Sequence, residues 1–109
     1  MTGNVSGATG KIGIEVAASH VTIDLNGFTL LGVGGSLDGI RAGSGEANVS
    51  VLNGQVVGWG GDGINLAFAN SVLDDHAIIR GVHSSRNGGR GIRIGTNGLI
   101  VECTASGNA

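Results

Sequence analysis

The chain of 109 residues carries a formal net charge of −2, and 40% of its residues are hydrophobic. These values exclude simple disorder, and the lack of a basic field disfavours nucleic acid and anionic membrane surfaces as partners. Two Phe, one Trp and no Tyr also exclude a compact core built on large aromatic side chains.

Glycine accounts for 23 residues, and proline is absent. Collagen is excluded because there is no proline and no strict three-residue period. Abundant β-branched residues punctuated by Gly and Asn predict many short strands joined by tight turns. The sequence therefore predicts an all-β fold.

The first twelve residues are polar and rich in glycine. They lack the apolar region of a signal peptide, and no run in the chain approaches the length of a membrane span. Localisation stays open, because a longer parent protein could have been secreted. We expect residues 1–12 to form a partial N-terminal coil or a cap.

A Gly-Ile pair then recurs along the chain, beginning at residues 13, 39, 63 and 91, with spacings of 26, 24 and 28 residues. Each pair opens a phrase, GIEV, GIRA, GINL or GIRI, that alternates apolar and polar residues as a half-buried strand does. Stacking the phrases predicts two inward columns: Ile14/Ile40/Ile64/Ile92 and Val16/Ala42/Leu66/Ile94.

The second half of each unit also aligns with its neighbours. NVSVLNGQVVGWGGDGI superposes on the segment 28 residues later, and AIIRGVHSSRNG on the segment 21 residues later. In the first unit VTIDLNGFTLLG carries one extra residue, which predicts a bulge near Asp24, and four Asn-Gly pairs fit corners. The alignment predicts three more inward columns: Val51/Ile79/Ile100, Val82/Cys103 and Val56/Ser84/Ala105.

A repeat of 24 to 28 residues with several short strands and glycine-marked corners predicts a right-handed parallel β-helix of about four coils, spanning residues 13–109. Neighbouring coils would lie ~4.8 Å apart. A sandwich of hairpins is the competing all-β fold, but it does not explain columns of like residues at constant phase.

The chain resembles the right-handed parallel β-helix repeat proteins of the pectate-lyase-like superfamily, in particular its uncharacterised bacterial members. The segments that carry the resemblance are GIEVAASHVTIDLNGFTLLG, NVSVLNGQVVGWGGDGI and NGGRGI. The resemblance covers residues 10–109 and implies the fold. It implies no single function, because that superfamily includes polysaccharide lyases, glycoside hydrolases, phage tailspikes and adhesins. The catalytic motifs of polygalacturonase-like members are not matched in context.

One lateral strip of the coils gathers the candidate catalytic residues Asp38, Asp62 and Arg90. The resemblance implies that an active site would lie on such a strip, and two carboxylates about 5 Å apart would suit a retaining glycosidase. Arg41 and Arg93 are candidate ligands for the acid groups of a polysaccharide.

The alternative interpretation of this strip is a solvated face. Glu15 would then pair with Arg41, and Asp62 with Arg90, as weak ion pairs between coils.

Trp59 is a candidate for stacking on a sugar ring, although a Trp at a corner also packs against a neighbouring loop. Asp74, Asp75 and His76 lie in an insertion and could bind a divalent ion, but adjacent residues rarely face one ion together. No metal or cofactor is therefore predicted. Cys103 is expected to be an inert buried thiol.

The last coil would expose an apolar layer formed by Ile92, Ile94, Ile100 and Cys103. We expect another chain to cover it in a two-fold end-to-end dimer, and we expect the repeat region to be truncated at its C-terminal end. The predicted function is a non-enzymatic structural or interaction module that offers a carbohydrate-binding surface. The alternative is a remnant or subunit of a polysaccharide lyase or glycoside hydrolase.

Overall fold

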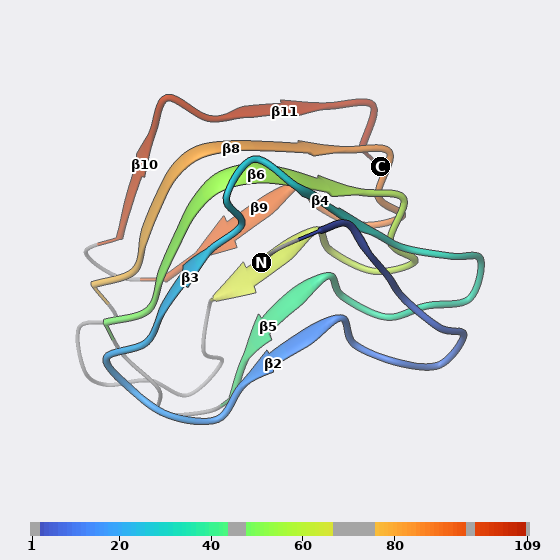
Figure 1. Ribbon diagram of the computed structural model, residues 1–109, viewed down its shortest axis with the longest axis horizontal. Coiled ribbons are helices and arrows are strands. Elements are labelled where there is room, and N and C mark those ends of the chain that lie inside the picture. The colour runs from blue at the N-terminus through green and yellow to red at the C-terminus, as the bar shows by residue number, and fades with distance from the viewer. Residues whose placement is uncertain (1–2, 44–47, 67–75, 96–97, 109) are drawn as a thin grey trace.

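The computed structural model describes residues 3–43, 48–66, 76–95 and 98–108, and the protein is all-β with parallel strands (Figure 1). The strands form a four-stranded sheet and a seven-stranded sheet. None of the described ranges contains a helix that is long and apolar enough to cross a membrane.

The four-stranded sheet consists of the strands that open each repeat. Its neighbours are parallel and in register, so that Ile14 pairs with Ile40, Ile40 with Ile64 and Ile64 with Ile92, as the sequence predicts. In order across the sheet, the strands are β2 (Ile14–Val16), β5 (Ile40–Ala42), β7 (Ile64–Leu66) and β9 (Ile92–Ile94).

The glycine of each Gly-Ile pair is required by the close stacking of the repeats. A Cβ atom added to Gly13 would lie 2.5 Å from the carbonyl oxygen of Gly39, and one added to Gly39 would lie 2.6 Å from that of Gly63. Gly63 stands in the same relation to Gly91. A side chain at these positions would therefore force neighbouring repeats apart.

The seven-stranded sheet has two halves because its long strands bend. The first half joins β3, the beginnings of β6 and β8, and β10, whereas the second joins β1, β4, the ends of β6 and β8, and β11. The strands are β1 (Val5–Ser6), β3 (Thr22–Asp24), β4 (Thr29–Leu31), β6 (Ser50–Val57), β8 (Ile78–Ser85), β10 (Leu99–Val101) and β11 (Thr104–Ser106).

Two of the predicted inward columns of this sheet are confirmed by its registers. Val51 pairs with Ile79 and Ile79 with Ile100, and the second half likewise aligns Val56, Ser84 and Ala105. Cys103 lies between β10 and β11, half-buried against the core.

The bend between the halves lies where residues of successive repeats adopt a positive φ. Asn53 in β6 has φ 55°, Gly81 in β8 has φ 64°, and Glu102 after β10 has φ 51°. Figure 1 shows β6 and β8 curving through this bend side by side. The corner predicted at Asn53 is confirmed, and the corner predicted at residues 97 and 98 lies partly outside the described residues.

The corner predicted at Asn87-Gly88 is displaced by one residue. Positive φ values occur instead at Gly58, Arg86 and Gly107, which occupy equivalent positions in three repeats. Asn87, the residue that follows Arg86, has its side chain buried in the core.

The first repeat carries two extra residues, not the one that the sequence predicts. Asp24 pairs with Leu52 but Thr29 pairs with Gln55, so two residues of the first repeat have no counterpart in the second. The excess is accommodated by a turn with positive φ at Asn26. Leu25 turns into the core, where it is fully buried.

Candidate functional site

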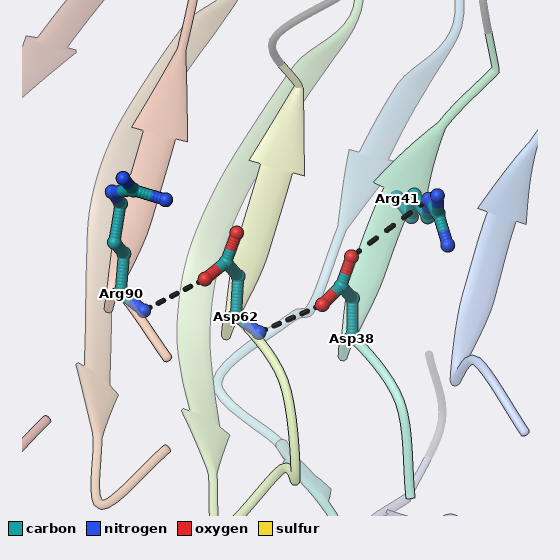
Figure 2. A network of polar contacts seen from close by, with 4 residues as sticks. All are labelled: Asp38, Arg41, Asp62 and Arg90. Atoms are coloured by element: carbon teal, nitrogen blue, oxygen red, sulfur yellow. Dashed lines mark hydrogen bonds and ion pairs between the residues drawn. The ribbon is translucent and has the colours of Figure 1, made fainter. Parts of the chain in front are cut away.

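The candidate catalytic residues occupy equivalent positions on the loops that lead into the four-stranded sheet. Asp38 lies two residues before β5, Asp62 before β7 and Arg90 before β9. The backbone aligns them, because Gly39 donates its N–H to the carbonyl oxygen of Asp62, and Gly63 to that of Arg90. Figure 2 shows the three residues side by side along one strip, as predicted.

Each carboxylate of this strip accepts a hydrogen bond from the backbone of the next repeat. Asp38 Oδ1 lies 2.7 Å from the backbone nitrogen of Asp62, and Asp62 Oδ1 lies 2.7 Å from that of Arg90. In Figure 2 a dashed line joins the backbone nitrogen of Arg90 to the Asp62 carboxylate, and none joins the guanidinium to it. The predicted ion pair between Asp62 and Arg90 is therefore wrong: a backbone N–H, rather than the guanidinium, contacts the carboxylate.

Two glycines leave room for these carboxylates to fold over the loops. A Cβ atom on Gly61 would collide with Asp38 Oδ1, and one on Gly89 would collide with Asp62 Oδ1. The pattern Gly-Gly followed by Asp or Arg thus builds a corner in which each carboxylate satisfies a backbone donor. This arrangement stabilises the stack whether or not it performs chemistry.

An outward column of polar residues runs beside the strip. Glu15, Arg41, Asn65 and Arg93 lie in register on successive strands. Arg41 Nε is 3.8 Å from Asp38 Oδ2, and half of the Arg41 side chain is exposed, so this ion pair is weak. Contact of a polysaccharide with Arg41 and Arg93, both exposed, stays a prediction.

Trp59 does not lie on the surface, and the prediction that its ring stacks on a sugar is corrected. The side chain is 1% exposed, and its Nε1 donates to the carbonyl oxygen of Leu30 at 3.1 Å. The indole fills a space that the glycines at positions 7, 13 and 39 leave open. A buried ring offers no face to a ligand.

A buried polar column follows Trp59, and sequence reasoning missed its role. Asn87 Oδ1 accepts the backbone N–H of Trp59 at 2.9 Å, and Asn108 Oδ1 accepts that of Asn87 at 3.0 Å. The Asn87 amide group also donates to Ser84 Oγ, which is fully buried. The available signal was the equivalent position of Trp59, Asn87 and Asn108 in three repeats.

The predicted association residues lie at one end of the stack, which we call the C-terminal edge (β9, β10 and β11). Ile100 is 44% exposed, whereas Val51 and Ile79 in the same column are fully buried. Cys103 Sγ lies 3.3 Å from the carbonyl oxygen of Ile79. Within the described residues, no strand pairs with the other side of this edge.

The insertion contributes no evidence for a metal site. Asp74 and Asp75 lie outside the described residues, and only His76 of that cluster is placed. Across the ranges that the structure covers, no group of three His, Cys, Asp or Glu residues could hold a metal ion.

Comparison of the chain with protein-family models, with curated proteins and with solved structures finds no match. The resemblance to the pectate-lyase-like superfamily therefore stays a prediction.

Proposed function

We propose that the chain is a right-handed parallel β-helix of the pectate-lyase-like kind that serves as an interaction module rather than as an enzyme. Every strand pair is parallel and joins positions one repeat apart. The chain alternates between the two sheets in each repeat, which is how a solenoid is wound. Right-handedness is the strong preference for connections between parallel strands of one sheet.

The strip of Asp38, Asp62 and Arg90 supports a non-enzymatic role. The hydrogen bonds from both carboxylates to backbone donors account for these residues as parts of a structural corner. Trp59, the one aromatic candidate for sugar recognition, is buried. These observations favour the module over a polysaccharide lyase or a glycoside hydrolase.

The C-terminal edge is the surface that we propose for association, and Ile100 is the single residue that carries the argument. Its side chain occupies the inward column of Val51 and Ile79, both of which are completely buried, yet it is 44% exposed. An exposed strand edge combined with an open apolar layer pairs readily with another chain. A second copy would cover both in a two-fold end-to-end dimer.

Sedimentation velocity over a wide concentration range tests this proposal. We expect the chain to dimerise and Ile100→Lys to abolish the dimer, because the substitution places a charge in the open layer. The matched control is Leu99→Lys, on the same strand but on its outward side, which should leave the dimer intact. Circular dichroism verifies that both variants fold.

Disulfide formation through Cys103 tests whether the dimer is two-fold symmetric. A two-fold contact between two C-terminal edges brings Cys103 of both copies to one interface, so mild oxidation should give a disulfide-linked dimer. A chain that stays monomeric at every concentration, or an Ile100→Lys variant that dimerises like the unmodified chain, would refute the proposal.

A further inference from the structure

β1 has, at the N-terminal end of the stack, the same position within its repeat as β11 has at the C-terminal end. The two segments read Val5-Ser6-Gly7 and Ala105-Ser106-Gly107, and both belong to the second half of the seven-stranded sheet. β1 pairs with β4, and Gly7 then donates its N–H to the carbonyl oxygen of Leu31 at 2.7 Å. Arg86, which follows β8, makes the equivalent bond to the carbonyl oxygen of Ser106, the register partner of Ser85 in the next repeat. Gly107 of a second copy could donate to Leu31 in place of Gly7.

β1 covers the N-terminal edge of β4, as a count of the strands stacked in each part of the two sheets shows. The four-stranded sheet has four rows (β2, β5, β7, β9), and the first half of the seven-stranded sheet also has four (β3, β6, β8, β10). The second half has a fifth row, because β1 lies outside β4. A second copy that pairs its β9 with β2 and its β10 with β3 would bring its β11 into the place of β1.

The surfaces that would meet in this head-to-tail contact are complementary. Ile92 would lie on Ile14, and Ile100 on Ile23, which continues the inward columns of the chain. Arg93 would lie beside Glu15, both of which are exposed and outward-facing. Opposite charges directly across from each other on neighbouring strands attract.

β1 is held by few contacts. It is two residues long and exposed at both of them. Its flanking bonds, from Gly7 to Leu31 and from the Thr29 backbone N–H to Asn4 Oδ1, are also near the surface. A short exposed strand of this kind opens at low free-energy cost compared with the core strands.

We propose that β1 is a displaceable strand that prevents this chain from stacking head to tail on further copies of itself. When β1 leaves, β11 of another copy takes its place on β4, and the contact repeats without closing, so that a filament grows. The inference goes beyond the proposed function: the head-to-tail contact uses the same C-terminal edge as the two-fold dimer, so when β1 is removed the filament forms in place of the dimer.

Two variants that remove β1 test the inference. One lacks residues 1–6, and the other is Val5→Asp, which puts a charge in the inward column above Leu30. Sedimentation and electron microscopy should show species larger than dimers for both, whereas the full chain stops at the dimer. Ser6→Asp is the matched control, because Ser6 pairs with the exposed Leu31 and faces outward.

Charge reversal then identifies the contact. In the chain without residues 1–6, Glu15→Arg or Arg93→Glu alone should weaken elongation by about threefold to tenfold, and the combined reversal should restore it. Folded variants lacking β1 that stop at the dimer, or a double reversal without rescue, would overturn the inference. If instead the full chain fails to dimerise while the shortened chain elongates, only the proposed two-fold dimer is refuted.

Discussion

The repeats have an inner, buried corner and an outer, partly exposed corner. In both, a side chain accepts a hydrogen bond from the backbone of a neighbouring repeat, but the side chains differ. At the buried corner, Asn87 Oδ1 accepts the N–H of Trp59 in the preceding repeat. At the exposed corner, Asp38 Oδ1 accepts the N–H of Asp62 in the following repeat. In both places a side chain satisfies a backbone donor that the strand ladder leaves unpaired.

The choice of side chain follows from the surroundings. A buried carboxylate would lose its hydration, whereas a neutral amide can accept one bond and donate others, as Asn87 does to Ser84 and Asn108. At the outer corner the Asp38 side chain is 13% exposed, so its carboxylate keeps some contact with water, and it is the stronger acceptor. The inner corner should therefore contribute more stability than the outer one.

The largest expected effect comes from emptying the inner corner. Trp59→Ala should lower the free energy of unfolding by about 3–5 kcal/mol, because it leaves a cavity that the surrounding glycines cannot fill. Urea unfolding followed by circular dichroism measures the loss. Leu37→Ala, at a 44% exposed position, should cost less than about 0.5 kcal/mol. Equal losses for both variants would contradict the packing described here.

Removing the inner hydrogen bonds should have the next largest effect. Asn87→Ala leaves the Trp59 N–H without its acceptor and Ser84 without a donor, and should cost about 1–3 kcal/mol. Hydrogen exchange at the Trp59 amide should accelerate in parallel. Asn87→Asp keeps the acceptor but buries a charge, so we expect it to be no more stable than the Ala variant.

The outer corner should respond more weakly. Asp62→Ala should cost about 1 kcal/mol, by analogy with a lost helix cap, and Asp62→Asn should cost less because its amide oxygen can still accept the Arg90 N–H. Thermal unfolding of the two variants measures the difference. An Asp62 that serves only in chemistry would leave the melting temperature unchanged in both.

The smallest effect is expected at the ion pair outside this corner. Arg41→Ala breaks a 3.8 Å contact to Asp38 and should change stability by less than about 0.5 kcal/mol. Repeating the urea titration at high salt should remove even that change, since exposed pairs are screened. A loss of stability that persists at high salt would show that the Arg41 side chain contributes through packing and not through its ion pair with Asp38.

The sequence predicts which residues share a column of the stack, but it does not predict which of their atoms make the contacts. The column of Ile14, Ile40, Ile64 and Ile92 follows from alternation and spacing, and the same phase places Asp38, Asp62 and Arg90 on one strip. Phase alone does not reveal which atom of a residue makes a contact. Arg90 was therefore placed correctly, but its backbone rather than its guanidinium meets Asp62.

Trp59 shows why a corner residue is hard to assign from sequence. Whether it points inward depends on the conformation of the preceding residue, and Gly58 adopts φ 76°. That torsion is shared by Gly107 and by Arg86, and only glycine signals it in a sequence. The corner predicted at Asn26-Gly27 is confirmed by the positive φ of both residues, but the alignment counts one extra residue there instead of two.

The contact between Leu25 and Gly54 limits how such a chain can grow by gene duplication. Leu25 occupies the space in which any Cβ atom at Gly54 would lie, and that atom would also come within 2.8 Å of the Phe28 carbonyl oxygen. A tandem copy of the first unit would lack this glycine and would meet its own leucine. Any unit that directly follows a copy of the first one must therefore carry glycine at the position of Gly54.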